Sequence, residues 1–192
     1  PYEKLVRKVV LVLILFFRSL LFSLYFYISV IVFTLFFVIL SPFIGLKKRY
    51  GLTSGFITTL LIVLRFLCQI DWKVYGNILS KKPIIIASNH QGIWESFYLQ
   101  TLANPLTTII KKELIYIPFF GWALNLLNPI KINRSKKLQS AKKVIESGAE
   151  KIRNGFSILL FPEGTRKNPG NEVGKFARSA ADSVSYTHLT LP

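Results

Sequence analysis

One stretch of the chain, Ser88-Asn89-His90-Gln91-Gly92-Ile93-Trp94-Glu95, places a carboxylate five positions after a histidine. A neutral imidazole can take a proton from a hydroxyl group, and a neighbouring carboxylate orients the ring and stabilises the imidazolium that forms. Five helical positions rotate a side chain by roughly 140° beyond a full turn, so His90 and Glu95 would not share a helix face. We expect them to meet if His90 lies in a loop and Glu95 in the first turn of the following helix. Taken alone, such a pair is more often structural than catalytic.

A second stretch, Phe161-Pro162-Glu163-Gly164-Thr165-Arg166, combines a tight turn with groups that can hold an anion. Gly164 lets backbone N–H groups approach a ligand closely, Thr165 has a hydroxyl group, and Arg166 offers a planar fork that matches phosphate oxygens. The structural alternative is a turn that ends a strand and carries a solvated arginine. Cationic clusters also follow two other apolar runs: Lys111-Lys112-Glu113-Leu114 and Lys131-Ile132-Asn133-Arg134. If these three clusters lie on one edge of the folded domain, they would indicate an anion site.

The elements that must position these residues follow from the hydrophobic pattern between residues 71 and 161. Alternating or short apolar runs predict strands over residues 71–76, 84–87, 107–110, 129–132 and 156–161. Helical spacing predicts helices over residues 94–102, 119–127 and 135–155, the last with Ser135 as N-cap and Gly155 as C-cap. Alternating strands and helices predict an α/β domain with a mostly parallel sheet flanked by helices. Sites in such sheets gather at the carboxyl ends of the strands, where His90 and Glu163 would both lie.

The first 70 residues have a different character, which is typical of a membrane anchor. Between Arg18 and Lys47 lie 28 residues without a charge, more than the roughly 20 that cross a bilayer. A signal peptide would have a shorter apolar core and a small-residue cleavage site. A second uncharged run, residues 50–64, is short for a span and predicts a re-entrant or interfacial helix. We therefore expect a membrane-embedded helical pair, whose ends can lie on the same side of the membrane.

Composition excludes several classes of protein. The net charge is +16, but 51% of the 192 residues are hydrophobic, which is not typical of a soluble nucleic-acid-binding protein. We expect no nucleic-acid partner, and the excess of cations suits anionic lipid headgroups, phosphorylated substrates or an acidic carrier protein. Cys68 is the single cysteine, and the chain has two histidines. These counts argue against an intramolecular disulfide and against a metal site built from cysteine or histidine.

Together, the motifs resemble the glycerophospholipid acyltransferases of the 1-acylglycerol-3-phosphate O-acyltransferase type. The resemblance covers roughly residues 70–175. The family's first motif is Asn-His followed by an aspartate, and here Asn89-His90 is followed by Glu95 in the acidic position. The second block is matched by three segments: Lys111-Lys112-Glu113-Leu114, Ile117-Pro118-Phe119-Phe120-Gly121-Trp122 and Ile132-Asn133-Arg134. The third motif is matched almost fully by residues 161–166, and an N-terminal helical pair is similar to bacterial members.

The resemblance implies roles for these residues. His90 would be the general base on the free hydroxyl of lysophosphatidic acid, with Glu95 orienting it. The acyl donor would be the thioester of acyl-carrier protein or acyl-CoA, with no other cofactor and no covalent enzyme intermediate. The glycerol phosphate would be bound by six residues: Lys112, Arg134, Glu163, Gly164, Thr165 and Arg166. The protein would lie in the bacterial cytoplasmic (inner) membrane with its active site facing the cytoplasm, in contact with membrane lipids.

Two departures from the family pattern affect these expectations. Glu95 has one methylene more than the usual aspartate, which leaves the acceptor open between lysophosphatidic acid and another lysolipid, such as lyso-ornithine lipid or a lysophospholipid. The sequence after residue 182 fits no family pattern and resembles a translated adapter. We expect anchoring helices over residues 1–70, an incomplete acyltransferase domain over 71–182 and a non-native tail over 183–192. A non-catalytic basic membrane protein is the alternative from another functional class.

Overall fold

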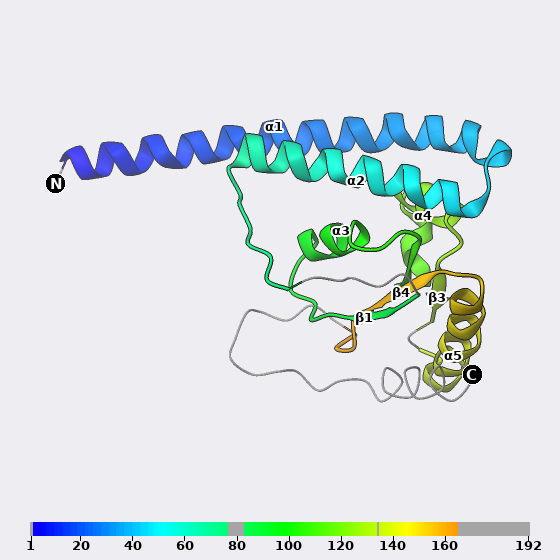
Figure 1. The fold of residues 1–192 in the computed structure, drawn as a ribbon. Helices are drawn as coiled ribbons and strands as arrows, with labels where there is room; N and C mark the ends of the chain where they lie inside the picture. Colours follow the sequence, from blue (N-terminus) through cyan, green and yellow to red (C-terminus); the bar gives the residue numbers. More distant parts are fainter. Residues whose placement is uncertain (1, 77–82, 134, 165–192) are drawn as a thin grey trace.

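The computed structural model describes residues 2–76, 83–133 and 135–164. Its first part is an antiparallel pair of long helices, α1 (Tyr2–Leu40) and α2 (Leu46–Cys68), joined by the short 3-10 helix η1 (Ser41–Phe43) (Figure 1). Pro42 lies in η1, and Gly45 has the extended backbone of a helix N-cap. A proline cannot continue the hydrogen-bond ladder of α1, and so the chain turns here and begins α2.

Both helices are long and apolar enough to cross a membrane. Their most apolar windows have mean hydropathies of 2.4 and 1.8, and only 11% and 17% of these windows are buried within the protein. The second helix is longer than the uncharged run over residues 50–64 predicts. It has 23 residues, about 35 Å, because Lys47, Lys48 and Arg65 lie within the helix instead of flanking it. The expectation that this second segment is too short to span a membrane was therefore wrong about its length.

The turn between the helices is held by one arginine. Arg49 donates hydrogen bonds to the backbone carbonyls of Ile44, Ser41 and Leu126, at 3.1, 2.6 and 3.1 Å. The first two close the turn, and the third ties it to the α/β part. Farther along the pair, the rings of Phe33 and Phe56 stack at 4.1 Å. The helical pair is therefore fixed both internally and to the rest of the molecule.

The α/β part contains a four-stranded, wholly parallel sheet in the order β1-β4-β2-β3. The strands are β1 (Ile85–Ala87), β2 (Leu106–Lys111), β3 (Ile130–Ile132) and β4 (Ser157–Leu160). Ala87 pairs with Leu160, and Lys111 pairs with Ile132. The predicted α/β class and parallel sheet are confirmed, and the carboxyl ends of all four strands meet at one edge.

The strand predicted over residues 71–76 was wrong, because this segment has no regular secondary structure and pairs with none of the four strands in the described part of the chain. Its alternation has another cause. Trp72 packs on Trp94 and Tyr98, with ring centroids 5.2 and 6.1 Å away. Asp71 forms an ion pair with Arg65 at 3.0 Å. Within this segment only Trp72 is partly buried, and so the apparent alternation reflects a single packed aromatic residue and no sheet face.

Three helices connect the strands: α3 (Trp94–Gln100), α4 (Phe120–Leu126) and α5 (Lys137–Arg153). The predicted N-cap of the last helix was wrong. Lys136 occupies that position without a capping side chain, and the Ser135 hydroxyl donates instead to Asn133 Oδ1 at 2.7 Å. At the other end, Gly155 lies one position beyond the cap with φ +82°, and the N–H of Phe156 bonds to the carbonyl of Lys151. This is the glycine-ended helix stop that the sequence predicts.

The helical pair and the sheet share one core. Phe37 of α1 and Tyr50 of α2 pack with Leu127 and Phe156, and all four are buried. The Tyr50 hydroxyl donates to the carbonyl of Leu127 at 2.8 Å and accepts from the Thr107 hydroxyl at 3.0 Å. A buried hydroxyl satisfied at both ends fixes the start of α2 against the sheet.

Candidate active site

The site is built where the adjacent strands β1 and β4 end. The N–H of Ser88, one residue past β1, bonds to the carbonyl of Leu160 at 3.1 Å. Two residues farther on, the ring of His90 stacks on Phe161, with centroids 4.2 Å apart and planes 25° from parallel. The first and third sequence motifs are therefore in direct contact, at the carboxyl edge of the sheet where both were predicted to lie, and the adjacency of β1 and β4 is what joins them.

The histidine and the carboxylate form a short, partly buried pair. His90 Nδ1 lies 2.9 Å from Glu95 Oε1, and the side chains are 17% and 19% exposed. His90 lies in the loop after β1, and Glu95 lies in the first turn of α3, which is the arrangement expected from their spacing. A carboxylate oxygen only accepts hydrogen bonds, so Nδ1 carries a proton and the neutral ring has an unprotonated Nε2. That nitrogen is the one available to accept a proton from a substrate.

The loop backbone holds the carboxylate in place. The N–H groups of Gln91 and Gly92 both donate to Glu95 Oε1, at 2.9 and 2.7 Å, so this oxygen has three donors. Partial burial raises the pKa of Glu95, but the hydrogen bonds from Gly92, His90 and Gln91 outweigh burial and leave this pKa below its ordinary value. Glu95 is therefore ionised at neutral pH. The stability that its ionised form contributes is present above the unfolded-state pKa, near 4.5, and is lost as pH falls through the lower folded-state value.

An aromatic cluster, defined as Trp72, Trp94 and Tyr98, lies beside the pair and was missed by sequence reasoning. Trp94 and Tyr98 are stacked at 5.0 Å with planes 7° apart, one helical turn from each other on α3. The guanidinium of Arg65, near the end of α2, lies 5.8 Å from the ring centre of Trp72. The four-residue spacing of Trp94 and Tyr98 was the signal for a shared face. The cluster connects the end of α2 to the helix turn that carries Glu95.

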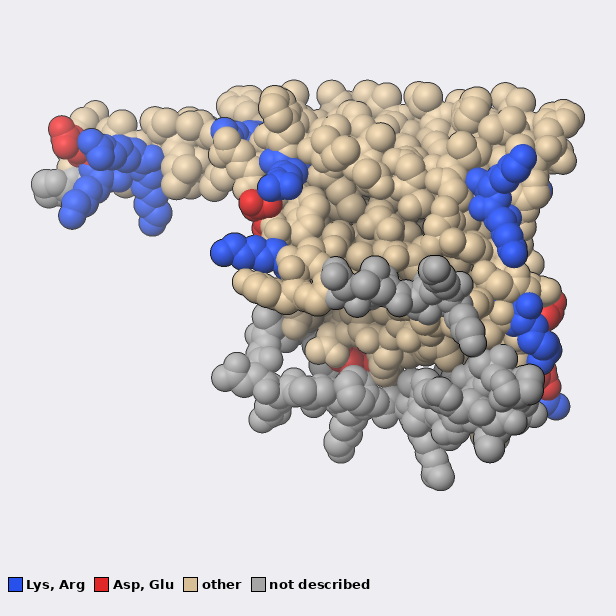
Figure 2. Space-filling model, viewed as in Figure 1, with Lys and Arg blue, Asp and Glu red and all other residues tan. Residues whose placement is uncertain are grey.

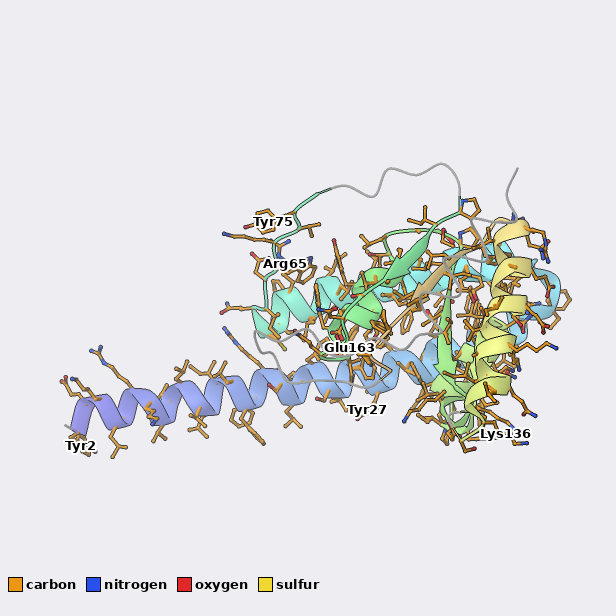
Figure 3. The ribbon with its side chains drawn as sticks, turned by 90° about the horizontal axis from the view of Figure 1, so that it is seen from below. Tyr2, Tyr27, Arg65, Tyr75, Lys136 and Glu163 are labelled. Carbon is orange, nitrogen blue, oxygen red and sulfur yellow. The ribbon has the colours of Figure 1, made fainter. Side chains whose placement is uncertain are left out.

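The anion-binding candidates are only partly within the described residues. Lys112 is exposed at the end of β2, on the same sheet edge as His90, but no contact joins the two. Glu163 and Gly164 form the turn after β4, where the N–H of Gly164, at φ +68°, bonds to the carbonyl of Phe161 at 3.0 Å. Figure 3 shows Glu163 near the middle of the molecule and Lys136 apart from it, at the start of α5. Three other candidates lie outside the described residues: Arg134, Thr165 and Arg166.

Gly121 belongs to the second block of the family motif, and its lack of a side chain has a structural reason. The segment after Lys111 forms the short 3-10 helix η2 (Lys112–Tyr116), which packs on α4. A Cβ at Gly121 would lie 2.5 Å from the backbone oxygens of both Leu114 and Ile115. Because Gly121 has no side chain, α4 can approach η2 closely. This contact fixes the segment that begins with Lys112.

Replacement of Gly121 by alanine is therefore expected to destabilise the protein by about 2–3 kcal/mol, because the rigid backbone on both sides must separate. The thermal unfolding midpoint of purified protein measures the effect. Gly55→Ala is the matched control, since a Cβ there meets nothing within 4 Å. Equal midpoints for the two variants would show that the close approach at Gly121 is not needed.

Comparison with known proteins gives a consistent result. The family described as "Acyltransferase" matches residues 71–190. A 1-acyl-sn-glycerol-3-phosphate acyltransferase of Pseudomonas aeruginosa is 38% identical over 141 residues, covering 72% of this chain and 54% of the relative. The enzyme of the same name from Saccharomyces cerevisiae is 37% identical over 107 residues, covering 54% of this chain and 35% of the relative. The chain thus spans about half the length, or less, of these curated relatives.

A solved structure shares the fold. The crystal structure of the 1-acyl-sn-glycerophosphate (LPA) acyltransferase PlsC from Thermotoga maritima superimposes with a TM-score of 0.67 at 26% identity, covering 90% of this chain and 71% of that one. The match includes most of the helical pair as well as the sheet, because it covers nearly the whole chain. With the family match over residues 71–190, this agreement confirms the resemblance inferred from the motifs. The chain belongs to the 1-acyl-sn-glycerol-3-phosphate acyltransferase family.

Proposed function

We propose that this protein transfers a fatty acyl group from acyl-carrier protein or acyl-CoA to the free hydroxyl of 1-acylglycerol-3-phosphate, which yields phosphatidic acid. The observation that carries the proposal is the 2.9 Å contact between His90 Nδ1 and Glu95 Oε1, which occupies Nδ1 and so makes Nε2 the ring nitrogen that can accept a proton from a substrate. The names of the relatives from Pseudomonas aeruginosa and Saccharomyces cerevisiae support the same acceptor.

The reaction follows from this geometry. Nε2 of His90 takes the proton of the acceptor hydroxyl as its oxygen attacks the thioester carbonyl carbon, and Glu95 stabilises the imidazolium. The tetrahedral intermediate collapses, the carbon–sulfur bond breaks, and the imidazolium returns the proton to the leaving thiolate. The products are phosphatidic acid and a free thiol, and the enzyme is regenerated without a covalent intermediate.

The phosphate of the acceptor needs cations near the base. Lys112 lies on the same sheet edge as His90, and the turn at Glu163 and Gly164 follows Phe161, on which the His90 ring stacks. With Arg134, Thr165 and Arg166, these residues form the substrate-binding set that we propose. An arginine matches two phosphate oxygens at once, so Arg166 is the member from which we expect the largest effect on KM.

The helical pair accounts for membrane association. In the view of Figure 2, the edge of the pair that faces away from the sheet carries no Lys or Arg, whereas cations lie toward the sheet. Exposed apolar side chains run along α1, and those of Leu13, Phe17, Leu24 and Val32 are each at least half exposed. We propose that the pair lies in the bacterial inner membrane and holds the site at its cytoplasmic surface, where anionic lipids attract cations.

An acceptor-competition assay tests the proposed function. Purified protein in nonionic detergent is supplied with acyl-CoA or acyl-carrier protein and with lysophosphatidic acid, lyso-ornithine lipid and a lysophospholipid together. We expect phosphatidic acid as the main product, with kcat/KM at least tenfold above the other acceptors, because only this acceptor carries a phosphate monoester. A preference for another lysolipid would overturn the assigned acceptor. Salt-sensitive lipid binding without turnover would instead favour a non-catalytic membrane protein.

A further inference from the structure

A second cationic site lies away from His90. An open cavity of about 760 Å³ is bordered by the start of α2, the start of β3 and the face of α5 from Lys143 onward. Six charged residues line it, five of which are lysines: Lys47, Lys48, Lys131, Lys143, Lys151 and Glu150. Figure 2 shows Lys and Arg side chains gathered at the end of the molecule where α2 begins and along α5. We call this the lysine cavity.

The lysine cavity is separate from the candidate active site. Its wall includes Ile130, the first residue of β3, and Phe156, which directly precedes β4. These are the amino ends of parallel strands, whereas His90 follows the carboxyl end of β1. The two sites therefore lie at opposite edges of the sheet, and the lysine cavity does not bind the reacting hydroxyl.

Within the described residues, the lysines of this cavity form no ion pair with a carboxylate. The ion pair formed on α5 joins Lys142 to Glu146, neither of which lines the cavity. Lys131 donates to the neutral Asn125 side chain at 2.9 Å. Burial lowers the pKa of Lys151, although the nearby Glu150 carboxylate opposes this shift. An excess of like charges around one cavity is relieved by a bound anion.

The cavity also has an apolar wall. Phe156 is 5% exposed, and the ammonium groups of Lys151 and Lys47 lie 4.9 and 5.9 Å from its ring centre. Lys47 can reach this position because Gly155 has no side chain, since a Cβ there would lie 3.0 Å from Lys47 Nζ. Leu46 lies on the same wall. A cationic rim above an apolar wall fits a ligand that is itself amphipathic.

The position of the cavity indicates the source of that ligand. Gly45 and Leu46, at its border, directly follow the turn that joins the two apolar helices. Phe43 in this turn is 82% exposed, as is expected of a side chain that enters a membrane. With the helical pair embedded in the membrane as proposed above, the cavity lies beside this exposed turn and within reach of lipid headgroups.

We propose that the lysine cavity binds one anionic membrane phospholipid, with its phosphate held by the ammonium groups and its glycerol carbons against Phe156. The bound lipid offsets part of the positive charge of the rim and fixes the start of α2, and hence the shared core, at the membrane surface. This role concerns the placement of the enzyme in the membrane and is independent of which lysolipid it acylates.

Native mass spectrometry of purified protein in nonionic detergent tests the proposal, with phosphatidylglycerol as the probe. Lys47→Gln combined with Lys151→Gln is expected to weaken binding of one phosphatidylglycerol at least tenfold, because two contacts to the phosphate are lost. Lys136→Gln combined with Lys142→Gln is the matched control, which removes equal charge outside the cavity and should change the affinity less than twofold. If the first pair unfolds, Lys48→Glu with Lys143→Glu replaces it, since both side chains are exposed.

Two further probes identify the source of the phosphate. Phosphatidylcholine should bind at least tenfold more weakly than phosphatidylglycerol, and millimolar inorganic phosphate should not displace the bound lipid. Equal loss of affinity in the control pair would overturn the site. Displacement by inorganic phosphate would overturn a lipid ligand in favour of a free anion. Because Lys47 and Lys151 are remote from His90, acyl transfer measured in detergent should persist in all these variants.

Discussion

Replacement of His90 by alanine is expected to lower kcat/KM for acyl transfer to lysophosphatidic acid by about 10²–10⁴-fold, the usual contribution of a general base. The reason is that Nε2 is the atom that removes the hydroxyl proton, while Nδ1 is occupied by Glu95 at 2.9 Å. KM should change little, because the proposed phosphate-binding residues are untouched. A radiolabelled acyl-CoA assay over a range of lysophosphatidic acid concentrations separates the two parameters.

The matched control is Gln91→Ala, in the same loop. The Gln91 side chain is exposed, and its contribution to the site comes from the backbone N–H that alanine keeps. We expect near-normal kcat and an unchanged thermal unfolding midpoint for this variant. Turnover in the His90→Ala protein within a few-fold of the wild type would remove the base from the mechanism.

Replacement of Glu95 by glutamine is the change with the second-largest expected effect, about 10²-fold in kcat. The amide oxygen can still accept from the N–H groups of Gln91 and Gly92, so the loop should keep its shape. The imidazolium then loses its counter-charge, which the ionised carboxylate supplies in the native site. Activity should fall while the thermal unfolding midpoint stays within a few degrees of the wild type.

Two other substitutions at Glu95 separate the effect of its negative charge from its role in holding the loop backbone. Alanine removes the acceptor of two backbone N–H groups and should also destabilise the protein, by about 1–3 kcal/mol. Aspartate keeps the charge but is shorter by one methylene, so it cannot accept hydrogen bonds equally well from His90 and from the loop backbone. We therefore expect an activity between those of the wild type and the glutamine variant. Glu146→Gln on the exposed face of α5 is the control. Full activity in the glutamine variant would show that the charge is not used.

Strong periodic patterns in the sequence located most of the sheet. The apolar runs that end at Ala87 and Leu160 were recognisable because strands in a parallel sheet are apolar on both faces, although only the second is fully buried. Alternation alone was insufficient at residues 71–76, where Trp72 packs on α3 and imitates a strand pattern. The length of α2 was also underestimated. The sequence prediction ended the apolar run at charged residues, but Lys47, Lys48 and Arg65 all lie within the helix.

The site was predictable where it depends on neighbours in sequence. The loop that brings His90 to Glu95 follows from their spacing and from the apolar run before them. The three donors on Glu95 Oε1 depend on backbone angles that residue types do not specify. The lysine cavity was not predictable for a related reason, since its lysines come from α2, β3 and α5, and only the fold brings them to one cavity.

The proposed mechanism requires that His90 and Glu95 act as one unit on the acceptor hydroxyl. The most direct test is a double-mutant cycle in which kcat for acyl transfer to lysophosphatidic acid is measured for His90→Ala, Glu95→Gln and the combined variant. If Glu95 acts only through His90, the combined variant is no slower than His90→Ala alone, because the carboxylate has no imidazolium left to stabilise. If the two losses multiply instead, the residues act independently, and a coupled His90–Glu95 base is contradicted.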